Sequence, residues 1–94
     1  MFLHVSDATY IEDFKINIVF NNGRKGVVDL TDSLYGPVFE PLKNATLFSQ
    51  VFVHKDLETI SWPNGADLAP EYLYFKAFQN EPELQEQFKK WGYN

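Results

Sequence analysis

The chain has 94 residues, of which 45% are hydrophobic and 17% aromatic. That is enough apolar mass for one packed domain and too little for a second core. Cysteine is absent, which excludes a disulfide framework, a thiolate zinc site and a thiol nucleophile. The formal net charge is −5, and the only basic pairs are Arg24-Lys25 and Lys89-Lys90. This balance argues against direct nucleic-acid binding, which needs clustered cations.

The location of the protein is predicted from what its sequence lacks. No apolar run approaches the roughly 20 residues needed to cross a bilayer. Residues 1–7 have neither the basic start nor the apolar stretch of a signal peptide. We therefore expect a cytoplasmic protein with no membrane contact, folded as a single domain over residues 1–94.

Two strands are predicted at the N-terminal end. The first spans residues 2–7, residues 8–9 form a turn, and a longer strand spans residues 10–20. Every second residue from Phe14 to Phe20 is apolar, which is the pattern of a half-buried strand.

The following hairpin has two possible registers. A two-residue loop at Asn22-Gly23 would place two charged residues on the apolar face, whereas a three-residue loop, 21–23, keeps that face apolar. The three-residue loop pairs Phe14 with Leu30, Lys15 with Asp29, Ile16 with Val28 and Ile18 with Gly26. We expect this second register, with Gly23 in a left-handed conformation.

Short helical turns and a second hairpin are predicted next. Residues 31–37 contain capping residues and a terminating Gly-Pro pair, and Asn44 can cap a turn over residues 45–49. Strands 50–54 and 59–62 then pair so that Val53 faces Ile60.

Two helical segments complete the chain. Asp67 is a natural N-cap for a helix over residues 68–78 that holds Pro70 in its first turn. Residues 81–91 form an amphipathic segment. The overall prediction is an α+β fold: an antiparallel sheet of four or five strands from two hairpins, short helices and a C-terminal amphipathic helix. The core spans about residues 2–78.

The residue patterns of the common catalytic and metal sites are not found in the sequence. His4 and His54 are the only histidines, and neither lies in a motif with metal-ligand spacing. The serines are outside any nucleophile elbow, and the scattered glycines do not form a phosphate loop. We therefore expect a protein that is not an enzyme and that binds neither a metal ion nor a cofactor.

The segment 62–74 has a structural and a functional interpretation. In the structural one, Trp62 packs over the sheet, residues 63–65 turn and Asp67 caps the helix. In the functional one, a polar-rimmed groove is lined by Asn64, Asp67, Tyr72 and Tyr74. The C-terminal segment also has two interpretations: its apolar face either docks on the chain's own sheet or contacts a partner. This face carries Leu84, Phe88 and Trp91.

Several runs together resemble a prokaryotic family catalogued as domain of unknown function 2442. These runs are residues 10–20, 22–30, 36–42, Phe48 and residues 62–74, which include Trp-Pro-Asn-Gly-Ala-Asp. The resemblance implies an α+β fold in a bacterial cytoplasmic protein. It also implies a link to protein pairs, since many members are encoded beside another small protein in an arrangement resembling a toxin–antitoxin pair. Some members carry an added helix-turn-helix domain, for which residues 78–94 are too short. The family supplies no established catalytic residues.

Our leading hypothesis is a non-enzymatic protein–protein interaction module of unknown function, which the resemblance implies to be antitoxin-like. Its partner would be another small protein or a second copy of the chain. The alternative is a small-ligand-binding or regulatory domain with its groove around residues 64–74. The candidate binding residues are Trp62, Asn64, Asp67, Tyr72, Tyr74, Phe88 and Trp91.

Overall fold

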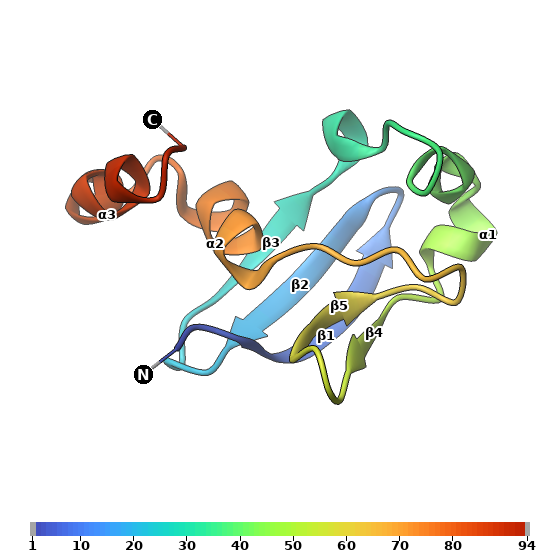
Figure 1. Cartoon of the computed structure of the whole chain (residues 1–94), viewed down its shortest axis with the longest axis horizontal. Coiled ribbons are helices and arrows are strands. Elements are labelled where there is room, and N and C mark those ends of the chain that lie inside the picture. Colours follow the sequence, from blue (N-terminus) through green and yellow to red (C-terminus); the bar gives the residue numbers. More distant parts are fainter. Residues whose placement is uncertain (1, 94) are drawn as a thin grey trace.

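The computed structural model describes residues 2–93, which form two small antiparallel sheets and several short helices (Figure 1). One sheet has the strand order β1-β2-β3 and the other pairs β4 with β5. The strands are β1 (Val5–Glu12), β2 (Lys15–Phe20), β3 (Lys25–Asp29), β4 (Phe52–His54) and β5 (Thr59–Ser61). The α-helices are α1 (Ala45–Phe48), α2 (Pro70–Phe78) and α3 (Gln85–Lys90). The 3₁₀ turns are η1 (Thr31–Ser33), η2 (Glu40–Lys43) and η3 (Pro82–Leu84). The predicted α+β class is confirmed, with the strands divided between two sheets.

The first hairpin turns later than the sequence pattern predicts. β1 and β2 are joined at residues 13–14, where Asp13 has a φ of 48°, and not at residues 8–9. The pairing of β1 with β2 is Tyr10 with Ile16, Ala8 with Ile18 and Val5 with Phe20. The predicted boundaries 2–7 and 10–20 are therefore wrong. Alternating side chains show that a segment is extended but not where it reverses, and Asp tolerates the left-handed conformation that this reversal needs.

The β2–β3 hairpin has the register that the charge and apolar patterns predict. Gly23 has a φ of 88°, as the three-residue loop requires. The observed pairs are Lys15 with Asp29, Ile16 with Val28 and Ile18 with Gly26. A one-residue slip would move the charged side chains onto the buried face, so burial fixes the register.

Two further local predictions are confirmed. The Asn44 side chain accepts hydrogen bonds from the backbone N–H groups of Thr46 and Leu47, at 2.9 and 3.3 Å, and so caps α1. In the second hairpin, Val53 pairs with Ile60. The β1 edge of the larger sheet lies beside this hairpin, and the Val5 N–H donates to the Glu58 carbonyl at 2.9 Å.

Helix α2 begins at Pro70, so Asp67 is not its N-cap. The cap residue is Ala69, and no side chain bonds to the first turn. Asp67 instead forms an isolated bridge with Ser61, beside the 3.0 Å hydrogen bond from Trp62 N–H to the Ala66 carbonyl. This bridge holds the chain extended after β5, and the fixed φ of Pro70 then favours helix initiation at that residue.

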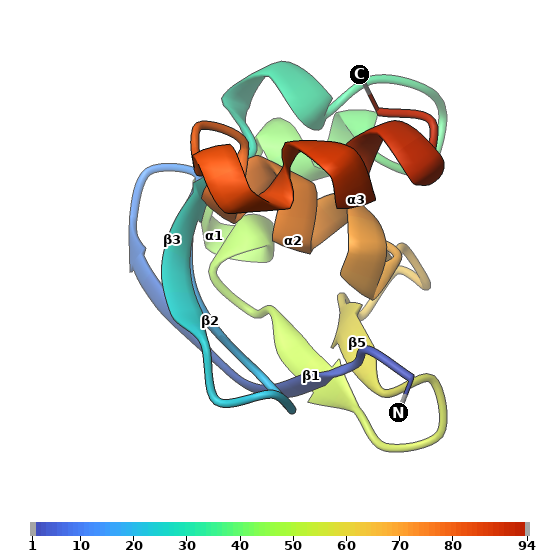
Figure 2. The ribbon, with the colours of Figure 1, turned by 90° about the vertical axis from the view of Figure 1, so that its left-hand side faces the viewer.

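The helices lie on one side of the curved three-stranded sheet, and the core is between them (Figure 2). The sheet contributes its inner face, while Leu73 of α2, Phe48 of α1 and Trp62 after β5 cover it, all at most 1% exposed. On the opposite face of the sheet, Thr9, Val27 and Asp29 are exposed. The larger sheet is therefore buried on one side only, which is why its strands alternate.

The C-terminal helix docks on its own chain, and on α2 more than on the sheet. Phe88 is 0% exposed, and its ring centroid lies 5.2 Å from that of Phe75 and 6.3 Å from that of Tyr74. Within residues 2–93, no helix is both long enough and apolar enough to span a membrane.

Candidate functional site

Helix α2 separates two surface pockets, which we call the end pocket and the side pocket. The end pocket has a volume of about 300 Å³ and the side pocket about 230 Å³. The end pocket is lined by Phe2, Leu3, Asn21, Asn22, Tyr74, Leu84, Gln87 and Trp91. The side pocket is lined by Ser33, Tyr35, Phe39, Leu68 and Tyr72. Because Tyr72 and Tyr74 are two positions apart on a helix, they project to different sides and line different pockets.

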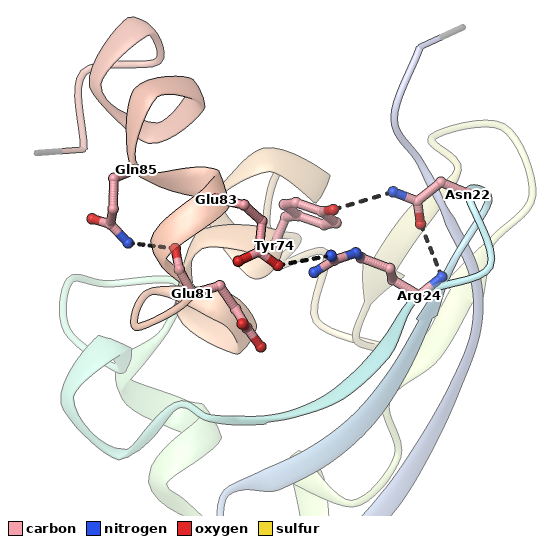
Figure 3. A network of polar contacts seen from close by, with 6 residues as sticks. All are labelled: Asn22, Arg24, Tyr74, Glu81, Glu83 and Gln85. Atoms are coloured by element: carbon pink, nitrogen blue, oxygen red, sulfur yellow. Dashed lines mark hydrogen bonds and ion pairs between the residues drawn. The ribbon is translucent and has the colours of Figure 1, made fainter.

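A polar network supports the wall of the end pocket (Figure 3). The Asn22 amide donates to the Tyr74 hydroxyl at 3.2 Å, and its oxygen accepts from the Arg24 N–H at 3.0 Å. The Arg24 guanidinium binds Glu83 at 3.2 Å and lies 5.3 Å above the centre of the Phe78 ring. These contacts hold the β2–β3 turn against α2 and η3.

Three neutral side chains at the end pocket have donor groups that are not used within residues 2–93. Tyr74 is only 5% exposed and its hydroxyl accepts from Asn22, so the hydroxyl proton is free to donate. The Gln87 amide and the Trp91 indole N–H make no hydrogen bond within residues 2–93. These groups suit a ligand that presents hydrogen-bond acceptors beside an apolar surface.

Aromatic rings form the apolar part of the same pocket. The Trp91 ring lies 6.1 Å from Tyr74 and 6.0 Å from Phe88, centroid to centroid. Phe2 is 92% exposed at the opposite rim. Phe88 itself is buried beneath Trp91, so it supports the pocket wall without reaching the cavity. Three predicted binding residues, Tyr74, Phe88 and Trp91, are thus brought together.

The side pocket has a hydroxyl pair at its base. Ser33 Oγ and the Tyr72 hydroxyl are 2.7 Å apart, and Ser33 is 7% exposed. Tyr35 is 73% exposed at the rim. Tyr93 packs against Tyr72 with ring centroids 6.1 Å apart, and burial raises the pKa of the Tyr93 phenol above its ordinary value. The predicted residue Tyr72 belongs to this separate site.

The remaining predicted residues lie at the joint between β5 and α2. Trp62 is 1% exposed, and its indole N–H donates to the Phe48 carbonyl at 2.9 Å. The Asn64 amide donates to the Val38 carbonyl at 2.9 Å, and its oxygen accepts from the Ala66 N–H at 3.1 Å. Asp67 is exposed. Residues 62–67 therefore do not share a groove with Tyr74, and the polar groups of Trp62 and Asn64 are used within the fold.

Sequence reasoning missed most of the end-pocket lining. Residues 2–3 were predicted only as part of a strand, Asn21 and Asn22 only as loop residues, and Gln87 only as part of the C-terminal helical segment. An Asn-Asn-Gly turn has a sufficient local explanation, so nothing in it indicates contact with residues 84–91. Exposed aromatic residues near both ends of the chain were the one available signal.

Neither histidine contributes to a metal site in the described part of the chain. His4 Nδ1 lies 3.1 Å from Glu58 Oε2, and His54 Nδ1 accepts from the N–H groups of Asp56 and Leu57 at 3.1 Å each. Residues 2–93 contain no group of three His, Cys, Asp or Glu side chains placed to hold a metal ion.

Comparison with known proteins identifies the family and one similar structure. Residues 5–79 match the family model described as "Protein of unknown function (DUF2442)", so the chain belongs to this family. The fold is similar to the crystal structure of a Nitrosomonas europaea protein described as "Putative DNA Binding Protein NE0471", with a TM-score of 0.78 and 18% identity. The match covers 97% of this chain and 59% of the neighbour. No curated protein matches the chain significantly.

The description of this structural neighbour overturns one of our predictions about partners. We predicted from composition that direct nucleic-acid binding is disfavoured, yet the neighbour that shares this fold is described as a "Putative DNA Binding Protein". The prediction was drawn from the net charge of −5 and from the presence of only two basic pairs in the sequence. Net charge bears on solubility and non-specific association and does not determine the partner of a fold.

Proposed function

We propose that this chain is a non-enzymatic binding module of the cytoplasm that holds another protein at the end pocket. The observation that carries the proposal is the combination at this pocket of the exposed Phe2 ring and the half-buried Trp91 ring with the side-chain donors of Tyr74, Gln87 and Trp91, which are not used within residues 2–93. Large aromatic anchors beside a few polar groups are typical of the residues that dominate protein–protein affinity.

The chemistry of the pocket favours binding over catalysis. Its polar side chains are amides, an indole and a phenol. The set contains neither a carboxylate nor an imidazole, the groups most often used in general acid–base catalysis, whereas its hydrogen-bonding groups can position a partner. The toxin–antitoxin arrangement that the family resemblance implies would supply such a partner from the neighbouring gene.

A test of this proposal is co-expression with the protein encoded by the neighbouring gene, followed by size-exclusion chromatography with light scattering. We expect a stable hetero-complex that Trp91→Ala weakens and Trp91→Phe largely retains, because a second ring preserves most of the contact. Phe52→Ala is the matched control, since Phe52 is 43% exposed on β4, away from the pocket. Equal loss in the Trp91 and Phe52 variants, or no complex at all, would contradict the proposal.

A second candidate is participation in nucleic-acid binding, for which the similar fold of the N. europaea protein is the motivating observation. An aromatic pocket with amide groups also suits an unstacked base, because stacking on aromatic side chains tolerates any base. Fluorescence anisotropy with a single-stranded and a duplex DNA probe, each at low and moderate salt, tests this candidate. We expect binding that weakens with salt and that Trp91→Ala reduces; anisotropy unchanged at low salt would exclude it.

A further inference from the structure

The outer edge of β3 has backbone groups without a hydrogen-bond partner among residues 2–93. The Phe20 N–H donates to the Arg24 carbonyl at 2.8 Å, and the Leu30 N–H donates to the Phe14 carbonyl at 2.9 Å. In an antiparallel ladder, bonded and non-bonded pairs alternate along the strand. Gly26 and Val28 therefore bond to β2, whereas the N–H and C=O groups of the intervening residues point away from the sheet. These intervening residues are Lys25, Val27 and Asp29.

This edge differs from the opposite edge of the same sheet. β1 has two register irregularities and lies beside β4 and β5, where Val5 bonds to Glu58. β3 keeps a regular register, and its outward backbone groups make no hydrogen bond within residues 2–93. Bulges and coverage are common ways in which proteins protect an edge strand from pairing, and β3 has neither.

The side chains beside these backbone groups form a charge pattern. Lys25 and Asp29 are exposed at the two ends, and Val27 is 50% exposed between them. Thr31 holds Asp29 in place, since its hydroxyl and its N–H donate to the carboxylate at 2.6 and 3.0 Å. The edge thus presents a cation, an apolar group and a fixed anion at every second residue.

We propose that β3 accepts an extended segment of another protein as an added antiparallel strand. Addition of a strand to a free edge is a common mode of peptide recognition, in which the backbone bonds give affinity and the side chains give specificity. In this register the segment would place an acidic residue opposite Lys25, a β-branched residue opposite Val27 and a basic residue opposite Asp29. This surface is separate from the end pocket and does not rest on the proposed function.

The surroundings of β3 favour an extended segment over a second copy of the domain. Helix α2 packs so closely on β3 that a Cβ added to Gly26 would meet the Phe78 ring at 3.1 Å. Helices α2 and α3 lie to the inner side of β3 (Figure 2). Two copies joined by a two-fold axis at this edge would bring two α2 helices to the same place. An extended segment carries no helix on this side of the sheet and therefore avoids that clash.

The first test uses a capped synthetic peptide, Thr-Lys-Thr-Val-Thr-Glu-Thr, and the charge-swapped peptide Thr-Glu-Thr-Val-Thr-Lys-Thr. We expect the first peptide to shift the amide NMR signals of Lys25, Val27 and Asp29 and to slow their hydrogen exchange. We also expect it to bind at least about tenfold more tightly than the swapped peptide. Equal or tighter binding of the swapped peptide, or shifts confined to the end pocket, would overturn the proposal.

The variant Val27→Pro separates edge pairing from folding. The Val27 N–H points outward, so proline removes it and blocks the added strand without breaking a β2–β3 hydrogen bond. We expect this variant to lose the peptide, whereas Val27→Thr and Trp91→Ala retain it; circular dichroism of each variant verifies folding. If Val27→Pro is unfolded, Val27→Asp, which places a charge at the centre of the edge, takes its place with the same expected loss. Light scattering of the protein alone completes the test: a dimer that the Val27 variant abolishes would assign the edge to a second copy and overturn the proposal.

Discussion

The two tryptophans are used in opposite ways. Trp62 is 1% exposed, and its indole N–H bonds to the Phe48 carbonyl at 2.9 Å. Trp91 is half-buried, and its N–H makes no hydrogen bond within residues 2–93. A buried polar group left unpaired costs free energy, so the fold supplies a partner for the first tryptophan. Trp91 is partly exposed, so this penalty does not require the fold to supply a partner for its N–H.

The amide side chains repeat this difference. The Asn64 side chain at the joint bonds to the Val38 carbonyl and to the Ala66 N–H, whereas the side-chain amide of Gln87 at the end pocket is exposed and makes no hydrogen bond in the described residues. The same residue types therefore stabilise one region and remain available in the other. The difference lies in whether their polar groups are used inside the fold.

The largest expected effect comes from removing the buried tryptophan. Trp62→Ala should lower the free energy of unfolding by about 3–5 kcal/mol, because it leaves a cavity and orphans the Phe48 carbonyl. Urea denaturation followed by circular dichroism measures this loss. Trp91→Ala, the matched control, should cost much less, and similar losses in both variants would refute the contrast between the two tryptophans.

The next effect concerns the close packing that places α2 between the two pockets. Gly26→Val should cost about 1–3 kcal/mol, since even a Cβ at this position would lie 3.1 Å from the Phe78 ring. Thermal unfolding of the variant measures the cost. Adding Phe78→Leu should recover part of the loss, and a Gly26→Val protein as stable as the natural one would show that α2 is not held by this contact.

A smaller difference in stability is expected between variants of the two amide residues, Asn64 and Gln87. Asn64→Ala should lower stability by about 1 kcal/mol, because its side chain joins two backbone segments by hydrogen bonds. Gln87→Ala should change stability by less than about 0.5 kcal/mol. Parallel urea titrations compare the two variants. If Gln87→Ala were the more destabilising, the amide at the end pocket would have to be regarded as structural.

The smallest expected effect is on the pH dependence of folding stability. Hydrogen bonds from the Thr31 hydroxyl and N–H hold the pKa of Asp29 below its ordinary value, and Lys15 acts in the same direction. The folded pKa lies below the unfolded one, so the contribution of Asp29 to stability is complete above the unfolded pKa. It is lost as the pH falls through the folded pKa. Thr31→Val should raise the Asp29 pKa in an NMR titration, and an unchanged midpoint would contradict this cause.

Several local features could be read from the sequence alone. The β2–β3 register follows from alternation, since only one loop length keeps the inner face apolar and sets Lys15 opposite Asp29. The Asn44 cap can also be predicted locally, because the first N–H groups of a helix need a hydrogen-bond acceptor and the Asn44 side chain supplies one. The family resemblance was also visible in the sequence, and the match over residues 5–79 confirms it.

Other features could not be predicted from local sequence patterns. The first hairpin turn was misplaced because alternation continues through it, and Asp67 was misassigned because its bridge to Ser61 pairs it with a strand. The end pocket joins residues 2–3, the turn at 21–22 and residues 74–91, and no local pattern relates these segments.

Sequence by itself determined the β2–β3 register, the pairing of the second hairpin and the Asn44 cap, because capping, turn chemistry and side-chain alternation act within a few residues of the chain. The tertiary structure alone decided which aromatic and amide groups are buried and satisfied and which remain free at the surface. That outcome depends on packing between segments far apart in the sequence, which determines whether a polar group finds a hydrogen-bond partner among residues 2–93.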